Sequence, residues 1–237
     1  MQVSETCDPE NETQVVTHAD VEGAHVSDQH AVIPIIDALE EKGCKPEEVL
    51  ADTNYGSGQN IVDAAERDVE LVTPACGAAP QPAEGEVTRD DFVFSPDGQH
   101  LEQCPQGHTP IEQHASGPNG RRRTARMDTA ACATCPLLQV CPTRFNERAE
   151  TMTFTWSPAE GATVARRRAE QTPSFKTRYR MRSGIEATNS EYKGPYGGGR
   201  LRVRGDPAVR RTVKFKFMAL NLRRWVRAAR NAACEAA

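Results

Sequence analysis

The chain has 237 residues, of which 38% are hydrophobic and 26% charged, and its formal net charge is −4. No run of about 18 apolar residues occurs, which excludes a transmembrane helix, and the first residues are neither basic nor apolar, which excludes a secretory signal. We therefore expect a cytoplasmic protein without a membrane partner, large enough for one domain or one domain with an insertion.

The first 76 residues predict alternating strands and helices. Apolar and β-branched runs indicate strands at residues 2–6, 13–19, 48–52 and 69–73. A first helix is expected after Ser27, which is placed as its N-cap, and Gly43 is placed to end it. Its apolar residues recur at helical spacing: Val32, Ile35, Ile36 and Leu39. With a second helix at 59–67, this order predicts an α/β sheet.

Residues 77–173 have a different character. A linker-like stretch at 77–82 leads into a segment with clustered cysteines, the Arg121–Arg123 run and no long apolar period. Helical patterns return from residue 174. We therefore expect three parts: residues 1–76, an insertion at 77–173, and a helical region at 174–237.

The charge is divided unevenly along the chain. Residues 162–237 hold 19 Lys and Arg against 5 Asp and Glu, whereas residues 1–161 hold 10 against 28. A basic segment of this density is typical of a surface that faces phosphate groups. The alternative is a solvated face that docks on the acidic half of the chain, and composition alone favours neither.

Four of the eight cysteines form a cluster: Cys104, Cys132, Cys135 and Cys141. Cys132-x2-Cys135 has the spacing of a metal knuckle, and Cys104 with Cys141 would complete four thiolates around a structural Zn²⁺. His108 is an alternative ligand. The gap before Cys141 departs from a second Cys-x2-Cys, so reduced cysteines in a loosely packed insertion are the other interpretation.

A group of polar residues is expected on one helix face after residue 174. At about 100° per residue, a continuous helix places them within an arc of roughly 60°: Tyr179, Arg182, Glu186 and Lys193. This arrangement suits a carboxylate that binds a cation while its neighbours hold phosphates. The alternative is an ordinary surface ion pair between Arg182 and Glu186.

These residues carry a resemblance. Tyr179-x2-Arg182-x3-Glu186-x6-Lys193 resembles, residue for residue, the Y-R-E-K signature of a large group of DDE insertion-sequence transposases. The segment 50–56 resembles the strand and turn that carry the second catalytic aspartate of this group, which places that residue at Asp52. The cysteine pattern and the final helix also resemble the group, and the similarity spans nearly the entire chain.

The resemblance implies an RNase H-like fold, a mixed sheet flanked by helices, and DNA transposition as the activity. It implies that Asp52 and Glu186 are catalytic ligands of Mg²⁺ or Mn²⁺, which in pairs support phosphodiester cleavage and strand transfer. Transposon-end DNA would be the partner. The residues expected to contact it are Tyr179, Arg182, Lys193, Arg200, Arg202 and Arg204.

In the RNase H-like fold the first catalytic aspartate lies on the central first strand, and this chain begins where the second strand is expected. We therefore expect an incomplete core and a truncated, inactive copy, with Asp8, Asp20 and Asp28 as weak replacements for that aspartate. Whether the chain is an enzyme stays open. The alternative function is a non-catalytic DNA-binding or interaction module that modulates an intact transposase, through association with it or as a homodimer.

Other features have simpler interpretations. Arg121–Arg123 with Arg126 are either a DNA contact or a solvated loop run. The last helix has an apolar stripe that we expect to be core: Val209, Val213, Phe217 and Leu220. Trp225 is expected to be a core anchor.

Overall fold

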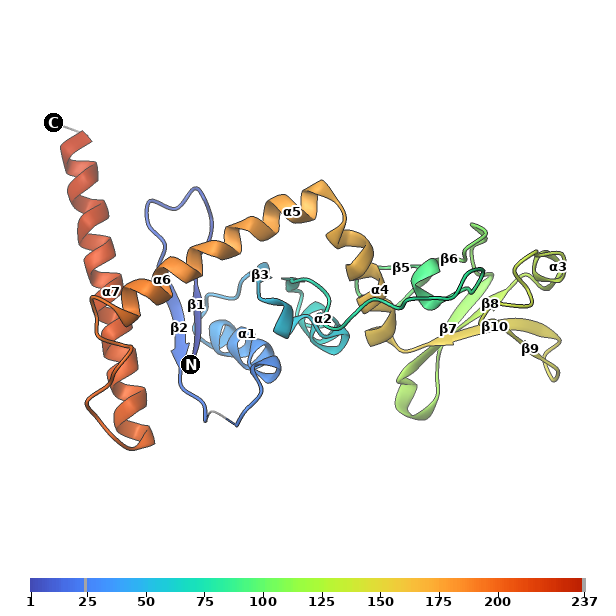
Figure 1. Ribbon diagram of the computed structural model, residues 1–237, viewed down its shortest axis with the longest axis horizontal. Helices are drawn as coiled ribbons and strands as arrows, with labels where there is room; N and C mark the ends of the chain where they lie inside the picture. The colour runs from blue at the N-terminus through green and yellow to red at the C-terminus, as the bar shows by residue number, and fades with distance from the viewer. Residues whose placement is uncertain (24, 236–237) are drawn as a thin grey trace. The chain divides into compact units, whose positions relative to one another are not determined.

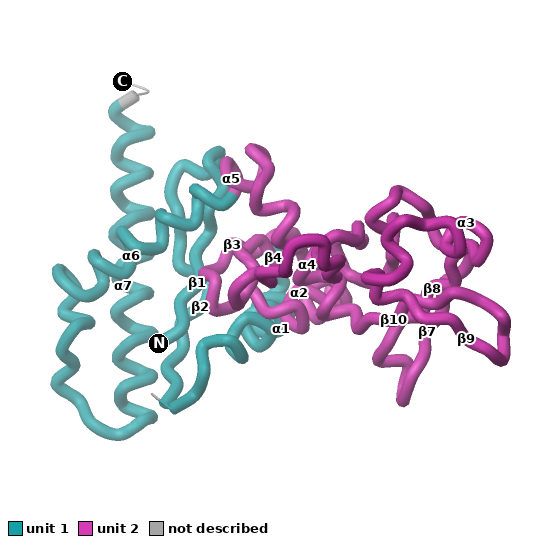
Figure 2. The backbone as a smooth tube through the Cα atoms, turned by 45° about the vertical axis from the view of Figure 1, so that its right-hand side comes forward, with its two compact units in different colours: residues 1–46, 179–237 teal, residues 47–178 magenta. Residues whose placement is uncertain are grey.

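The computed structural model describes residues 1–23 and 25–235, which form two compact units. Unit 1 contains residues 1–46 and 179–237, and unit 2 contains residues 47–178; Figure 2 shows them in teal and magenta. Helices and strands occur in both, so the mixed α/β class expected from the sequence is confirmed.

Unit 1 begins with an antiparallel strand pair. Strand β1 (Gln2–Glu5) pairs with β2 (Val16–Asp20), and helix α1 (Val32–Glu41) follows. Gly43 adopts the left-handed conformation, with φ 71°, and ends the helix as expected. The expectation for Ser27 was wrong: it precedes a short 3-10 helix, η1 (Asp28–His30), and its side chain makes no capping hydrogen bond.

The rest of unit 1 is helical. The end of α5 (Pro173–Tyr179) is followed by the 3-10 helix η5 (Arg180–Ser183), by α6 (Gly184–Lys193) and by the long α7 (Asp206–Glu235). Helix α7 packs beside β2 (Figure 1). The side-chain amide of Asn221 fixes this contact, because it donates to the Val16 carbonyl and accepts from the Val16 amide, both at 2.8 Å.

The predicted apolar stripe of α7 forms the core of unit 1. Val213, Phe217 and Leu220 are buried, and the Phe217 ring stacks on Tyr192 with 4.4 Å between ring centroids. The prediction for Trp225 was wrong, since its side chain is 64% exposed. It lies five residues after Leu220, which at about 100° per residue turns it roughly 140° away from the buried face.

Unit 2 starts with a parallel β-α-β segment. Strand β3 (Glu48–Leu50) pairs with β4 (Glu70–Val72), and α2 (Gly58–Ala65) connects them. Helix α4 (Pro158–Glu170) packs against α2 at Gly58, where a β-carbon would come within 1.9 Å of the Ala159 carbonyl oxygen. The element order predicted for the first 76 residues is therefore confirmed. The hydrogen bonds among the described residues join these strands as two separate pairs, β1–β2 and β3–β4.

The segment between β4 and α4 has a sheet and a core of its own. Strands β5 (Val93–Phe94) and β6 (Leu101–Gln103) form a pair, and four strands form a sheet in the order β7-β8-β10-β9. Their bounds are β7 (Glu112–Ser116), β8 (Arg122–Met127), β9 (Arg144–Asn146) and β10 (Thr151–Trp156), with α3 (Thr129–Ala133) after β8. The core is aromatic: Phe92, Phe94, Phe154 and Trp156.

Candidate functional site

Asp52 lies just after β3 in unit 2, where its side chain is exposed. Its carboxylate accepts a hydrogen bond of 2.7 Å from the Thr53 amide and so caps the 3-10 helix η2 (Thr53–Tyr55). Its own carbonyl accepts a hydrogen bond of 2.8 Å from the hydroxyl of Thr73, which is fully buried. The carboxylate is therefore held in solvent by a loop that is tied to the end of β4.

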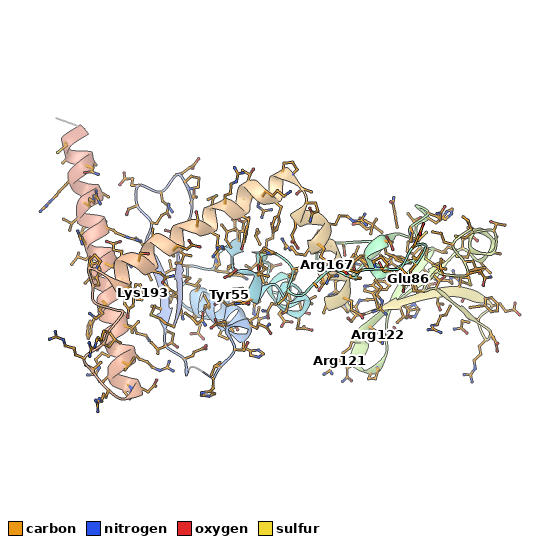
Figure 3. All side chains as sticks on the ribbon, in the orientation of Figure 1. Tyr55, Glu86, Arg121, Arg122, Arg167 and Lys193 are labelled. Atoms are coloured by element: carbon orange, nitrogen blue, oxygen red, sulfur yellow. The ribbon has the colours of Figure 1, made fainter. Side chains whose placement is uncertain are left out.

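Gly56 shows how closely this loop is packed. A β-carbon at this position would lie 1.9 Å from the Pro74 carbonyl oxygen, and the Gly56 carbonyl accepts a hydrogen bond from the Cys76 amide at 2.8 Å. Only glycine permits this approach of two backbone segments. Gly56, four positions after Asp52, thus holds the loop that carries this carboxylate against the segment that follows β4. Figure 3 labels Tyr55, in the same turn.

Tyr179, Arg182 and Glu186 form a chain of contacts in unit 1. The Arg182 guanidinium lies over the Tyr179 ring, 5.6 Å from its centroid, and donates to the Glu186 carboxylate at 3.1 Å. The expected continuous helix was wrong, because η5 interrupts it at 180–183. A 3-10 helix has about three residues per turn, so Tyr179 and Arg182 are stacked directly above each other.

Helix α6 separates a polar exposed side from a buried side. Glu186 and Lys193 are exposed, and they are seven residues apart, close to two helical turns. Thr188 and Tyr192 are buried. Figure 3 labels Lys193 at the end of this helix. The Glu186 carboxylate, two-thirds exposed, is therefore free to accept a ligand beyond Arg182.

The buried side of α6 is fixed by a polar network that no sequence pattern predicts. Arg224 of α7 donates to the carboxylates of Glu5 and Glu191, each at 3.2 Å, and to the Thr188 hydroxyl at 2.6 Å. The Glu5 side chain is only 7% exposed. The network joins β1, α6 and α7, so it sets the position of the helix that carries Glu186.

The other arginines expected to contact DNA lie in the segment between α6 and α7. Arg200, Arg202 and Arg204 are all exposed. Among the described residues, none of the three forms an ion pair, which would bring a guanidinium nitrogen within 4.0 Å of a carboxylate oxygen. Their guanidinium groups are thus accessible to an anion.

The three aspartates weighed as candidates for the first catalytic aspartate have local structural contacts. Asp28 accepts from the Gln2 amide at 2.6 Å, and Asp8 accepts from the Glu10 backbone at 2.9 Å. Asp20 pairs with Arg210 at 2.7 Å. Burial alone would raise the pKa of Asp20, but hydrogen bonds from the backbone and from Arg210 outweigh it and hold the pKa below its usual value.

The clustered cysteines come together in unit 2. The thiols of Cys104, Cys132, Cys135 and Cys141 line one cavity of about 30 Å³, with His108 also on its wall. All four are free of disulfides. Burial raises the pKa of the Cys132 thiol, and the three neighbouring cysteines add to the increase. The fold therefore brings cysteines that are up to 37 positions apart in the sequence to one place beside the aromatic core.

No ready-made coordination shell occurs within residues 1–23 and 25–235. There, no three side chains of His, Cys, Asp or Glu are grouped as ligands of a single metal ion. The cysteine thiols share a cavity without closing around one point, and the carboxylates of Asp52 and Glu186 belong to different units (Figure 2).

Comparison with protein families decides the assignment. Residues 103–226, slightly more than half of the chain, match the model described as a transposase DDE domain. The chain belongs to the DDE transposase family. No curated protein and no solved structure matches it.

The match places the two best-defined clusters inside the transposase domain. It includes the four clustered cysteines and the segment from Tyr179 to Lys193, and it begins after Asp52. DDE transposases act on DNA and generally use divalent metal ions. No helix in the described part of this transposase chain is both long and apolar enough to span a membrane.

Proposed function

We propose that the chain takes part in metal-dependent cleavage and transfer of DNA strands at insertion-sequence ends, as a member of the group with the Y-R-E-K signature. The contact chain from Tyr179 through Arg182 to the exposed Glu186 carries the proposal. It lies within the family match and presents one carboxylate beside a cation and an aromatic ring.

In this proposal Glu186 and Asp52 are carboxylate ligands of Mg²⁺ or Mn²⁺, and the catalytic domain is RNase H-like. The two carboxylates would hold divalent metal, which would supply activation of the attacking hydroxyl and stabilisation of the leaving oxygen of the phosphodiester. Mg²⁺ is usually held by one or two carboxylates together with substrate phosphate and water. Two exposed carboxylates on well-held backbone are consistent with this ligand set.

The basic residues near Glu186 would orient the DNA. Arg182 already donates to Glu186, and on metal binding its second edge is available to a phosphate, since a guanidinium has five donors. Lys193 faces the same side of α6 as Glu186. The three arginines between α6 and α7 would extend this surface along the DNA backbone: Arg200, Arg202 and Arg204.

The test of this proposal is metal-directed backbone cleavage. Fe²⁺ in place of Mg²⁺, with ascorbate and peroxide, cuts the polypeptide beside the bound ion, and mass spectrometry locates the cuts. We expect cuts near residue 52 and near residue 186 in the presence of duplex DNA, suppressed by Mg²⁺ or Mn²⁺. Asp52→Asn and Glu186→Gln should each abolish both sets, because each removes a ligand of the shared site.

Glu66→Gln, which changes an exposed carboxylate at the end of α2, serves as the matched control and should leave the cuts unchanged. Cuts at only one of the two positions, or cuts that persist in both ligand variants, would show that the two carboxylates do not share an ion.

We also propose that the cavity lined by the four cysteines takes up a structural Zn²⁺, with Cys104, Cys132, Cys135 and Cys141 as ligands and His108 beside them. Their gathering on one cavity wall supports this, since four thiolates are a frequent structural zinc set. Uptake would require the thiols to lose their protons and turn inward, and metal binding of this kind is coupled to folding.

Elemental analysis of freshly reduced protein should find one zinc per chain. Cys132→Ser with Cys135→Ser should lose it and melt at a lower temperature, because the metal no longer closes the segment from Cys104 to Cys141. Cys234→Ser is the matched control, as this cysteine is exposed and belongs to the other unit. Protein without zinc, and equal melting of all variants, would rule out the site.

A further inference from the structure

The four-stranded sheet of unit 2 has one buried face and one open face. Side chains alternate between faces along a strand, and residues opposite each other on neighbouring strands share a face. Ala125 and Phe154 are opposite each other, as are Met127 and Met152, and all four side chains are buried. They define the face that packs on the aromatic core.

The open face follows from the same register. It consists of Glu112, His114 and Ser116 from β7, Arg122, Thr124 and Arg126 from β8, Thr151, Thr153 and Thr155 from β10, and Arg144 and Asn146 from β9. Every one of these side chains is polar, and each residue is exposed or half-buried. An apolar protein partner would find no hydrophobic side chain to bury on this face.

Hydroxyl groups run across the middle of this face. The Ser116 and Thr124 hydroxyls are 2.7 Å apart, and the Thr124 and Thr155 hydroxyls are 3.3 Å apart. The Thr153 hydroxyl donates to the Arg144 carbonyl at 3.1 Å. Threonine and serine hydroxyls, together with arginine, are common donors to phosphate oxygens.

The open face is basic, although the first two-thirds of the chain are acidic as a whole. Residues 1–161 are strongly acidic, yet the open face has three arginines and one acid, Glu112, which pairs with Arg126 at 3.3 Å. Arg122 and Arg144 are exposed. Burial raises the pKa of the Glu160 carboxyl, but hydrogen bonds from Ser157 and the charges of Arg89 and Arg122 outweigh it and lower the pKa. That carboxylate is engaged by Arg89 and by the Ser157 amide.

The β7–β8 hairpin adds a second basic element at the edge of this face. Strand β10 ends at Trp156, which pairs with Arg123, so residues 117–122 extend beyond it. The turn is tight, with left-handed backbone at Gly117, Asn119 and Gly120. Figure 3 shows Arg121 and Arg122 at the end of this hairpin. A two-stranded ribbon fits the major groove of B-form DNA.

We propose that the open face of the β7-β8-β10-β9 sheet, with the tip of its hairpin, binds the phosphate backbone of duplex DNA. Arg122 and Arg144 make the main phosphate contacts, and the threonine hydroxyls between them fix the position of the DNA backbone. This contact does not require the metal ligands, and it rests on the proposed transposase function only for the choice of DNA as the polyanion.

The test measures binding of the full chain to a duplex of mixed sequence by fluorescence anisotropy, in EDTA and over a series of salt concentrations. Each phosphate contact contributes about 0.9 to the slope of log affinity against log salt. Arg122→Gln with Arg144→Gln should therefore reduce the slope by about 2 and weaken binding by about tenfold. Arg148→Gln is the matched control, because Arg148 is exposed on the turn between β9 and β10 and has Glu147 and Glu150 beside it.

A photo-crosslinking residue at position 153 tests DNA contact with the open face without changing any arginine. We expect it to attach to the duplex, and the same group at position 148 to attach much less. An unchanged salt slope in the double variant, or equal crosslinking at both positions, would overturn the proposal. Preferential binding of polyglutamate over DNA would overturn it in favour of an acidic protein partner.

The test of DNA binding by the open face and the test of the metal site can succeed or fail independently. If the face fails while the iron-directed cuts at residues 52 and 186 appear, the proposed function stands without this contact. If the face binds DNA and the cuts are absent, the contact stands and the metal site fails.

Discussion

Replacing Trp156 by alanine is expected to lower the free energy of unfolding of unit 2 by about 3–5 kcal/mol, the usual cost of removing a fully buried aromatic side chain. Trp156 is 0% exposed, and its ring lies 5.6 Å from Phe94 and 5.8 Å from Phe154 between centroids. Its indole N–H also donates to the Gly98 carbonyl at 2.8 Å. The substitution leaves a cavity and an unpaired buried carbonyl.

Chemical denaturation followed by circular dichroism measures this effect. Trp225→Ala is the matched control: the chain has two tryptophans, and Trp225 is largely exposed, so its loss should change stability by no more than about 0.5 kcal/mol. Trp156→Phe should fall between the two, because it keeps the ring packing and loses the hydrogen bond. Equal stability of the two alanine variants would contradict the assignment of the core.

Local patterns were sufficient to predict the elements of the first 76 residues. Val32, Ile36 and Leu39 recur at helical spacing and are all buried on one side of α1. Glycine at position 43 ended the helix for a reason that depends only on its own backbone. Such signals need no knowledge of distant residues.

Where distant residues decide, the sequence was less informative. The aromatic core of unit 2 pairs Phe92 with Phe154, whose rings stack at 4.3 Å between centroids although they are 62 positions apart. The strand register that forms this aromatic core also forms the open polar face of the sheet. The sequence of neither face shows a helical period or a long apolar run. The run Arg121–Arg123 can be seen in the sequence. Only the strand pairing shows that Arg121 and Arg122 lie at the exposed tip of the hairpin, whereas Arg123 lies on the buried face of the sheet.

The candidate site shows the same division. Contact between Arg182 and Glu186 was predictable because they are four positions apart in a segment expected to be helical. The 3-10 turn at 180–183 was not predicted, although Gly184, a poor helix former, directly follows it. The gathering of the cysteines was suggested by Cys132-x2-Cys135, whereas Cys104, which follows β6, is brought to the same cavity by the fold of the whole segment.

Arg224 has the largest expected effect in unit 1. It is 17% exposed and bridges Glu5 and Glu191, and it also donates to the Gln14 carbonyl at 3.1 Å. Arg224→Ala would leave the Glu5 carboxylate buried without a cation, and breaking a buried pair in this way costs about 3–5 kcal/mol. Because Thr188 belongs to the same network, α6 would lose its anchor two residues beyond Glu186.

Two measurements separate this role from a general loss of charge. Arg223→Ala removes the adjacent, exposed arginine and should leave the unfolding free energy almost unchanged. Glu5→Gln combined with Arg224→Met removes both charges of the pair, so the double variant should recover part of the stability lost in Arg224→Ala, as replacing a whole buried pair is far less costly than breaking it.

Iron-directed cutting near residue 186 should weaken in Arg224→Ala at temperatures where the chain is still folded, because the carboxylate of Glu186 is then less well positioned. Equal destabilisation by Arg223→Ala and Arg224→Ala would mean that the basic charge of α7, rather than this buried contact, holds the helix against β1 and α6.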